Sequence, residues 1–186
     1  MREARDRYFR ENGFGEDGGY GAAWVDFKLG PIPMPFPNTP GRVRAVRYHD
    51  LHHVLTGYAT DTRSEFEISA YEVGVGCGSF YTAWAINLSG MTAGLLSVPR
   101  RTYRAFVRGR HSRSLYLEPF EPLLEERVGE ARRARVAESP DATFGDVLAF
   151  AVASVVGAAV SLVFTALTLP LVPIGILAGL RRPAVA

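Results

Sequence analysis

The pattern of apolar and charged positions divides the chain into a mixed part and a purely apolar part. Residues 147–169 form an uninterrupted run of 23 uncharged, mostly apolar residues, and no charge occurs in the 34 positions before Arg181. A helix of this run is about 34 Å long, enough to cross a hydrocarbon core of about 30 Å. Because Pro170 and Pro173 interrupt the pattern, it predicts one transmembrane or re-entrant helix rather than two spans. We therefore expect residues 147–180 to form a membrane anchor; the alternative is a buried core helix.

The part before this run carries apolar residues at helical spacing. The spacing predicts a short helix over 2–10 and longer helices over 42–57, 62–84, 99–110 and 120–137. Within the helix that begins at position 62 or 64, glycines at 74, 76 and 78 predict a kink. No run of strand length alternates between apolar and polar residues. The expected fold class is all-α, a helical domain followed by a transmembrane or re-entrant apolar helix.

A proline-rich stretch separates the N-terminus from the expected helical domain. Residues 29–41 hold prolines at 31, 33, 35, 37 and 40, which favour extended chain over helix or central strand. Residues 1–41 are therefore interpreted as an N-terminal segment and connector, and residues 42–140 as the helical domain. We favour a connector over a recognition segment here.

Composition and charge narrow the function classes. The single cysteine, Cys77, excludes a disulfide framework and a four-cysteine zinc site. A formal net charge of +2 is too small for a concentrated basic face, so we expect no nucleic-acid partner. The first residues lack the apolar core of a signal peptide, and their acidic residues do not fit a transit peptide. The expected location is a bacterial inner membrane with the helical domain on its cytoplasmic side.

Three of the four histidines fall within five residues, in the sequence HDLHH. On a helix, His49 and His53 lie one turn apart, and Asp50 is three positions from His53. Glu65, in the first turn of the next expected helix, can fold back over them. Imidazole and carboxylate groups at this spacing predict a divalent metal site with ligands His49, Asp50, His53 and Glu65, and zinc is the favoured ion.

Two further residues are candidates for chemistry beside this site. Glu72 shares a face of its helix with Glu65 and small residues, where it can orient a ligand or move a proton. His52 points about 100° away from His53 and supports the site from outside or shuttles a proton. The plain alternative for the whole cluster is a solvated helix face. A protease motif needs glutamate where Asp50 stands, and no GxSxG elbow of a serine hydrolase occurs.

The spacing resembles that of a known family. HDxxH followed by eleven residues and glutamate is the signature of the ubiquinone (coenzyme Q) biosynthesis protein 4 family, and it occurs here from His49 to Glu65 without a gap. The resemblance covers about residues 10–135. It implies an all-α protein at the inner membrane with a metal held by His49, Asp50, His53 and Glu65. It also implies action on a polyprenylated quinone precursor, by oxidative decarboxylation at ring carbon 1, and organisation of the other quinone-biosynthesis enzymes.

The chain departs from that family in carrying its own apolar anchor and in its proline-rich and GVGCG segments. Six arginines between positions 100 and 113 are expected to contact membrane lipid headgroups or the substrate carboxylate, above all Arg100, Arg101, Arg104 and Arg108. A solvated helix face is the alternative for them. Two other functions stay open: a non-catalytic membrane scaffold with a structural metal site, and a metal-dependent lipid hydrolase.

Overall fold

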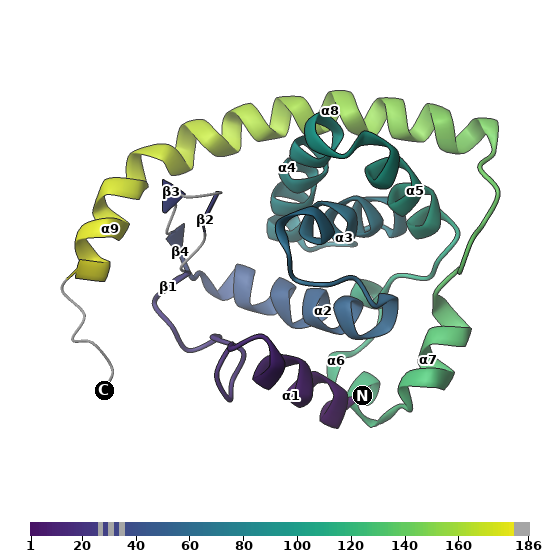
Figure 1. The fold of residues 1–186 in the computed structure, drawn as a ribbon, viewed down its shortest axis with the longest axis horizontal. Helices are drawn as coiled ribbons and strands as arrows, with labels where there is room; N and C mark the ends of the chain where they lie inside the picture. Colours follow the sequence, from purple (N-terminus) through teal and green to yellow (C-terminus); the bar gives the residue numbers. More distant parts are fainter. Residues whose placement is uncertain (26–27, 30–31, 34–35, 181–186) are drawn as a thin grey trace.

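Helix α3 lies at the centre of the fold, packed against α4 and α5 (Figure 1). The computed structural model describes residues 1–25, 28–29, 32–33 and 36–180. Helix α2 runs beside this group, α1 lies along α2, and α8 crosses the far side along α4. The helices are α1 (Arg2–Glu11), α2 (Pro40–Thr56), α3 (Thr62–Val75), α4 (Tyr81–Ser97), α5 (Pro99–Arg110), α6 (Phe120–Glu125), α7 (Val128–Arg135), α8 (Phe144–Thr168) and α9 (Val172–Leu180), with single 3₁₀ turns at η1 (Leu115–Leu117) and η2 (Leu169–Leu171). The predicted mostly helical fold with a long apolar C-terminal helix is confirmed.

Helix α2 begins and ends where its sequence supplies the caps. The hydroxyl of Thr39 accepts a hydrogen bond from the backbone N–H of Arg42, and Pro40 occupies the first helical position. At the other end Gly57 adopts a left-handed conformation with φ 79°, which terminates the helix. The predicted helix from position 42 is therefore present and is extended at its start by two residues.

The single kinked helix expected over residues 62–84 is wrong, because the chain breaks into α3 and α4. Helix α3 ends at Val75, where Gly76 has φ 87°, a value that side-chain-bearing residues rarely adopt. Gly74 lies so close to the carbonyl of Phe106 that a Cβ there would clash. The glycine-rich segment therefore both ends α3 and lets α3 and α5 approach closely.

The described residues of the proline-rich segment that precede α2 include short paired strands, in line with the expected extended chain. Strand β1 (Trp24–Val25) pairs antiparallel with β4 (Phe36–Pro37), and β2 (Lys28–Leu29) pairs with β3 (Ile32–Pro33). Both ladders are antiparallel and follow the same register, and the four strands β1–β4 are together called the hairpin below. Pro31 and Pro35 lie outside the described residues. The hairpin contacts α9 through β4.

The prediction of one continuous helix over residues 120–137 is also wrong, because this segment forms two helices, α6 and α7. Glu126 and Arg127 are extended and separate α6 from α7. Arg135 ties the two pieces together, with its guanidinium bonded to Glu118 at 2.7 Å and to Glu126 at 2.8 Å. Leu123 and Leu124 are buried, as the helical spacing predicts.

The long apolar helix lies along the domain and exposes most of its surface. The segment Phe144–Ile174 is long and apolar enough to cross a membrane, and only 6% of its most apolar window is buried. One side of α8 packs on α4, where Gly157 approaches the backbone of Leu88. Leucine and valine side chains such as Leu162 and Val155 project outward. The outward apolar face supports the expectation of a membrane anchor.

Candidate metal centre

Three ligand atoms from two helices converge at one point. The Nε2 atoms of His49 and His53 lie 3.1 Å apart. The Glu65 carboxylate is 3.5 Å from the first and 3.4 Å from the second. Two ligands of a tetrahedral zinc ion, each bonded at about 2.0–2.1 Å, lie about 3.3 Å from each other. The two histidine nitrogens therefore have the spacing that one small divalent ion requires; the two distances to Glu65 are from its Oε2 and Oε1 atoms, and one ligand atom from each of the three residues lies within 4.8 Å of the others.

Local sequence places these residues. His49 and His53 are one turn apart on α2, so their rings lie on the same face of that helix. The turn after Gly57 reverses the chain into α3, whose cap Asp61 accepts hydrogen bonds from the N–H groups of Arg63 and Ser64. Glu65 therefore lies in the first turn of α3 and faces the two histidines.

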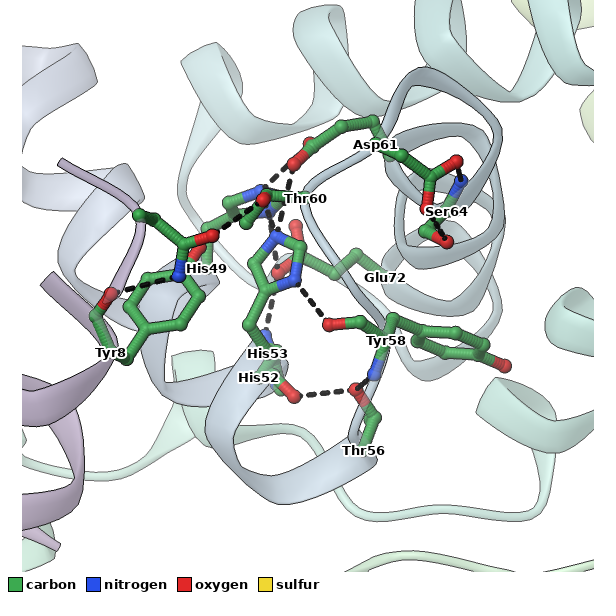
Figure 2. Close-up of polar contacts among 12 residues, drawn as sticks. Tyr8, His49, His52, His53, Thr56, Tyr58, Thr60, Asp61, Ser64 and Glu72 are labelled. Atoms are coloured by element: carbon green, nitrogen blue, oxygen red, sulfur yellow. Dashed lines mark hydrogen bonds and ion pairs between the residues drawn. The ribbon is translucent and has the colours of Figure 1, made fainter. Parts of the chain in front are cut away.

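Each histidine is held with Nε2 directed at the shared point. The Nδ1–H of His53 donates to the carbonyl of Tyr58 at 2.9 Å, and the ring of Tyr8 stacks on His53 with centroids 5.4 Å apart (Figure 2). The Nδ1 of His49 lies 3.2 Å from Glu72. An imidazole that donates through Nδ1 presents the Nε2 lone pair to a metal. These contacts orient both rings for metal binding.

Glu72 is fully buried beneath the ligands and has four polar neighbours. Its Oε1 lies 2.6 Å from His52 Nδ1 as well as near His49. Its Oε2 accepts a hydrogen bond from the Tyr116 hydroxyl at 2.8 Å and another from the Asn87 amide. A buried carboxylate with this many donors stays ionised. Glu72 is therefore suited to hold His49, the first of the two roles expected for it.

The carboxylates and imidazoles also shift one another's pKa. Burial by itself lowers the pKa of His49, but the charges of Glu72 and Glu65 and the hydrogen bonds to them raise it well above its usual value. Burial raises the pKa of Glu65, but hydrogen bonds from His49 and His53 lower it to about 2. Glu72 has its pKa lowered by His49 and His52 in the same way, against the effect of burial. The site therefore holds ionised acids beside basic rings.

The structure does not bring Asp50, the fourth expected ligand, into this group. Asp50 is buried, and its Oδ2 accepts a hydrogen bond from the Tyr20 hydroxyl at 2.5 Å. Burial raises the pKa of its carboxyl to about 6, against the opposing charge of His49. The physical reason is the helix itself, since the residue after His49 projects about 100° around the axis.

His52 is buried behind the ligands and does not line the cavity described below. Its ring lies beside those of Tyr71 and Tyr116, with centroids 5.7 and 5.3 Å away. Among the described residues, its Nε2 has no hydrogen-bond partner. Its contact with Glu72 makes it a support for that carboxylate, and a direct contact with substrate does not follow from this position.

A cavity of about 610 Å³ is lined by two of the three candidate ligands, His49 and Glu65. Its polar end is formed by His49, Glu65 and Glu72, together with Asp50, Asn87 and Tyr116. Its apolar walls come from the hairpin, α2 and α4, and include Trp24, Val25, Phe36, Val46 and Ile86. A volume of this size is typical of a site for a small molecule. The arrangement can hold an apolar ring while a polar substituent faces the ligands.

The four arginines expected at a carboxylate do not line this cavity. Arg101 forms an ion pair with Glu67 at 2.5 Å, and Arg108 donates to the carbonyls of Ala137 and Thr56. Arg100 and Arg104 are exposed on α5. Their contact with lipid headgroups stays a prediction. Among the arginines that the structure describes, the one that lines the cavity is Arg42. Its position seven residues before His49, on the same helix face, is the sequence signal that points to it.

Tyr8, Tyr20, Asn87 and Tyr116 were not expected at the site, because they come from segments whose sequences carry no metal-binding pattern. Comparisons of the chain with models of protein families, with curated proteins and with solved structures found no match. What the structure supports is a cluster of His49, His53 and Glu65 in the arrangement of an HxxxH…E metal motif.

Proposed function

We propose that this chain is a membrane-bound, metal-dependent enzyme of ubiquinone biosynthesis that acts on a polyprenylated benzenoid precursor. The reaction is oxidative decarboxylation at ring carbon 1, and the protein also serves to organise the other biosynthetic enzymes. The HDxxH-x₁₁-E spacing from His49 to Glu65 supports the choice of pathway. The metal is a divalent ion, zinc, held by His49, His53 and Glu65.

One observation carries the choice of an enzyme over a scaffold. Three protein ligands converge, two of them (His49 and Glu65) line a cavity of about 610 Å³, and the fourth expected ligand, Asp50, is bonded to Tyr20 instead. Structural zinc sites are closed by four protein ligands, whereas catalytic sites keep one position for substrate or water. Three ligands next to a cavity are therefore the arrangement of a catalytic site.

The chemistry follows from the residues around the cavity. A zinc ion supplies Lewis acidity that stabilises negative charge on an oxygen substituent of the ring. Glu72 keeps His49 in its ligating orientation, and the apolar walls exclude water from the ring. Overall, the ring carboxyl leaves as CO₂ and one atom of dioxygen enters as a hydroxyl. Two electrons and two protons from an external donor reduce the second oxygen atom to water.

The apolar C-terminal helix suits a substrate with a polyprenyl tail. Such a substrate stays dissolved in the bilayer, so an enzyme tethered there meets it at high local concentration. The outward face of Phe144–Ile174 is apolar, and its C-terminal continuation α9 contacts β4, whose residue Phe36 lines the cavity. The membrane segment and the cavity therefore lie on connected elements.

Substitution of Glu65 tests the proposal directly. We expect Glu65→Ala to abolish metal binding, because it removes the only ligand from α3, and to abolish quinone synthesis with it. Metal content of the purified full chain is measured by mass spectrometry, and a gene-deletion strain complemented with each variant is scored by mass spectrometry of its lipids. Glu67→Ala is the control, since Glu67 lies on the same helix but pairs with Arg101.

In the deletion strain a carboxylated polyprenyl-phenol should accumulate, and Glu67→Ala should restore the quinone. Quinone levels that do not change on deletion contradict the pathway. Quinone synthesis that persists in Glu65→Ala contradicts the role of the metal.

A further inference from the structure

Arg42 lines the cavity and precedes the metal ligand His49 by two turns of α2. It belongs to the first turn of α2, and it shares a helix face with Val46, His49 and His53. Seven residues separate Arg42 from His49, which is about 10.5 Å along a helix axis. The cavity is therefore lined both by a cationic group and, two turns further along α2, by the metal ligand His49.

The guanidinium of Arg42 has no carboxylate partner at ion-pair distance within the described ranges. Its Nη1 donates to the Asn38 side chain at 2.8 Å, and its Cζ lies 5.7 Å from the centroid of the Phe36 ring. A guanidinium has five N–H donors arranged to bind a carboxylate through two parallel hydrogen bonds. Arg42 therefore keeps donors for an anion that enters the cavity.

The position of Arg42 also strengthens its attraction for an anion. The side chain is half-buried, and burial lowers the pKa of its guanidinium, against the opposing charge of Asp50. A charge that is partly removed from water interacts more strongly with an opposite charge than an exposed one does. The nearby aromatic side chains Trp24 and Phe36 provide an apolar surface for a ring beside it.

We propose that Arg42 binds the carboxylate of an aromatic acid whose opposite oxygen substituent faces His49, His53 and Glu65. This assignment rests on the proposed function. It gives the contact with the substrate carboxylate to Arg42 of α2, whereas the sequence analysis expected it from the arginines of α5. A benzenoid ring with these two groups in para positions carries them on opposite sides, which suits binding groups that lie two helical turns apart on α2.

Binding of 4-hydroxybenzoate tests this assignment. The purified full chain in detergent, loaded with zinc, is titrated with 4-hydroxybenzoate in a calorimeter, and then with phenol and with inorganic phosphate. Arg42→Met should weaken 4-hydroxybenzoate about 10- to 100-fold, because charge-assisted hydrogen bonds are lost, and leave phenol unchanged. Arg42→Lys should keep part of the affinity, since it retains the charge but not the bidentate geometry.

Arg44→Met is the matched control, because Arg44 is exposed on the same helix and does not line the cavity. It should bind 4-hydroxybenzoate as the unsubstituted chain does. Thermal unfolding and zinc content of all variants show that the effect does not come from misfolding.

The assignment is overturned if Arg42→Met, folded and zinc-loaded, binds 4-hydroxybenzoate with unchanged affinity. Absence of 4-hydroxybenzoate binding to the unsubstituted chain overturns it as well, and so does phosphate binding more tightly than 4-hydroxybenzoate.

Two outcomes distinguish failure of the proposed function from failure of the assignment of Arg42. If the chain takes up no zinc, but 4-hydroxybenzoate binding still depends on Arg42, the metal enzyme is wrong and the anion site stands. If zinc depends on Glu65, and 4-hydroxybenzoate binding does not depend on Arg42, the metal enzyme stands and the anion site is wrong.

Discussion

The candidate metal centre buries ionisable side chains, whereas the C-terminal helix exposes apolar ones. Between α2 and α3, ionisable groups such as Glu72 and His52 are almost completely buried. Along α8, leucines and valines are exposed, and Leu162 shows 74% of its surface. Globular proteins ordinarily bury apolar side chains and expose charged ones. Each region therefore needs a separate reason for its composition.

The two reasons differ in kind. Buried charges are stable only when partners satisfy them, and the residues around Glu72 form such a set by themselves. An exposed apolar helix has no partner within the described part of the chain over most of its surface, so we expect the hydrocarbon of a bilayer to stabilise it. The comparison shows that the domain supplies partners for its buried charges, whereas most of the apolar surface of α8 is left uncovered by the described residues.

The largest effect is expected when the buried network loses its centre. Glu72→Ala leaves His49, His52, Asn87 and Tyr116 without their shared acceptor, inside the protein. We expect the free energy of unfolding to fall by about 3–5 kcal/mol, which is a large part of the stability of an ordinary domain. Chemical denaturation followed by circular dichroism measures this loss. Glu67→Ala, at a glutamate paired with the half-exposed Arg101, should cost much less. Equal losses would contradict the central role of Glu72.

A charge on the outward face of α8 tests the opposite region. Leu162→Arg places a guanidinium near the middle of the apolar segment, where arginine opposes membrane insertion by about 3 kcal/mol. We expect membrane partitioning to weaken roughly 100-fold, measured by co-sedimentation of the purified chain with lipid vesicles. Leu117→Arg is a close control, since Leu117 is equally exposed at 74% but lies on η1. If both variants lose vesicle binding alike, the apolar helix is not the anchor.

A smaller effect is expected where the two regions join. Asp146 closes the N-terminus of α8 through Thr143 in a capping box, and its carboxylate also contacts Arg110 at 3.2 Å and His111 at 3.0 Å. Asp146→Ala should lower the free energy of unfolding by about 1–2 kcal/mol, through loss of the cap. Hydrogen exchange should rise in the first turn of α8. Asp141→Ala, at an exposed residue before the helix, should leave exchange there unchanged. Unaltered exchange in Asp146→Ala would mean that packing on α4 alone fixes the helix.

Much of the fold can be predicted from local patterns. Helix α2 and helix α5 have their boundaries within two residues of the expected ones, because Thr39, Pro40, Gly57 and Pro99 act as helix signals over short distances. The break between α3 and α4 could not be predicted as more than a kink, since Gly76 ends a helix only when neighbouring elements hold its positive φ. The sequence likewise gives no sign that Glu126 and Arg127 separate α6 from α7.

The candidate site, like the fold, could be predicted from the sequence only in part. The spacing of His49, His53 and Glu65 follows from helix geometry and a short turn, and so the cluster could be expected. The sequence did not show that Asp50 bonds to Tyr20, or that Arg42 rather than an arginine of α5 lines the cavity. Those facts depend on how the N-terminal segment and hairpin fold over α2.

The amino-acid order by itself determined where the chain is helical, where it is apolar enough for a membrane, and which histidines share a helix face. These features arise from periodicity and from residues only a few positions apart. The tertiary structure alone decided that Asp50 bonds to Tyr20 instead of joining the cluster, which residues line the space beside the histidines and that Arg42 is among them. Such contacts join segments tens of residues apart, and only the packing of one helix on another fixes them.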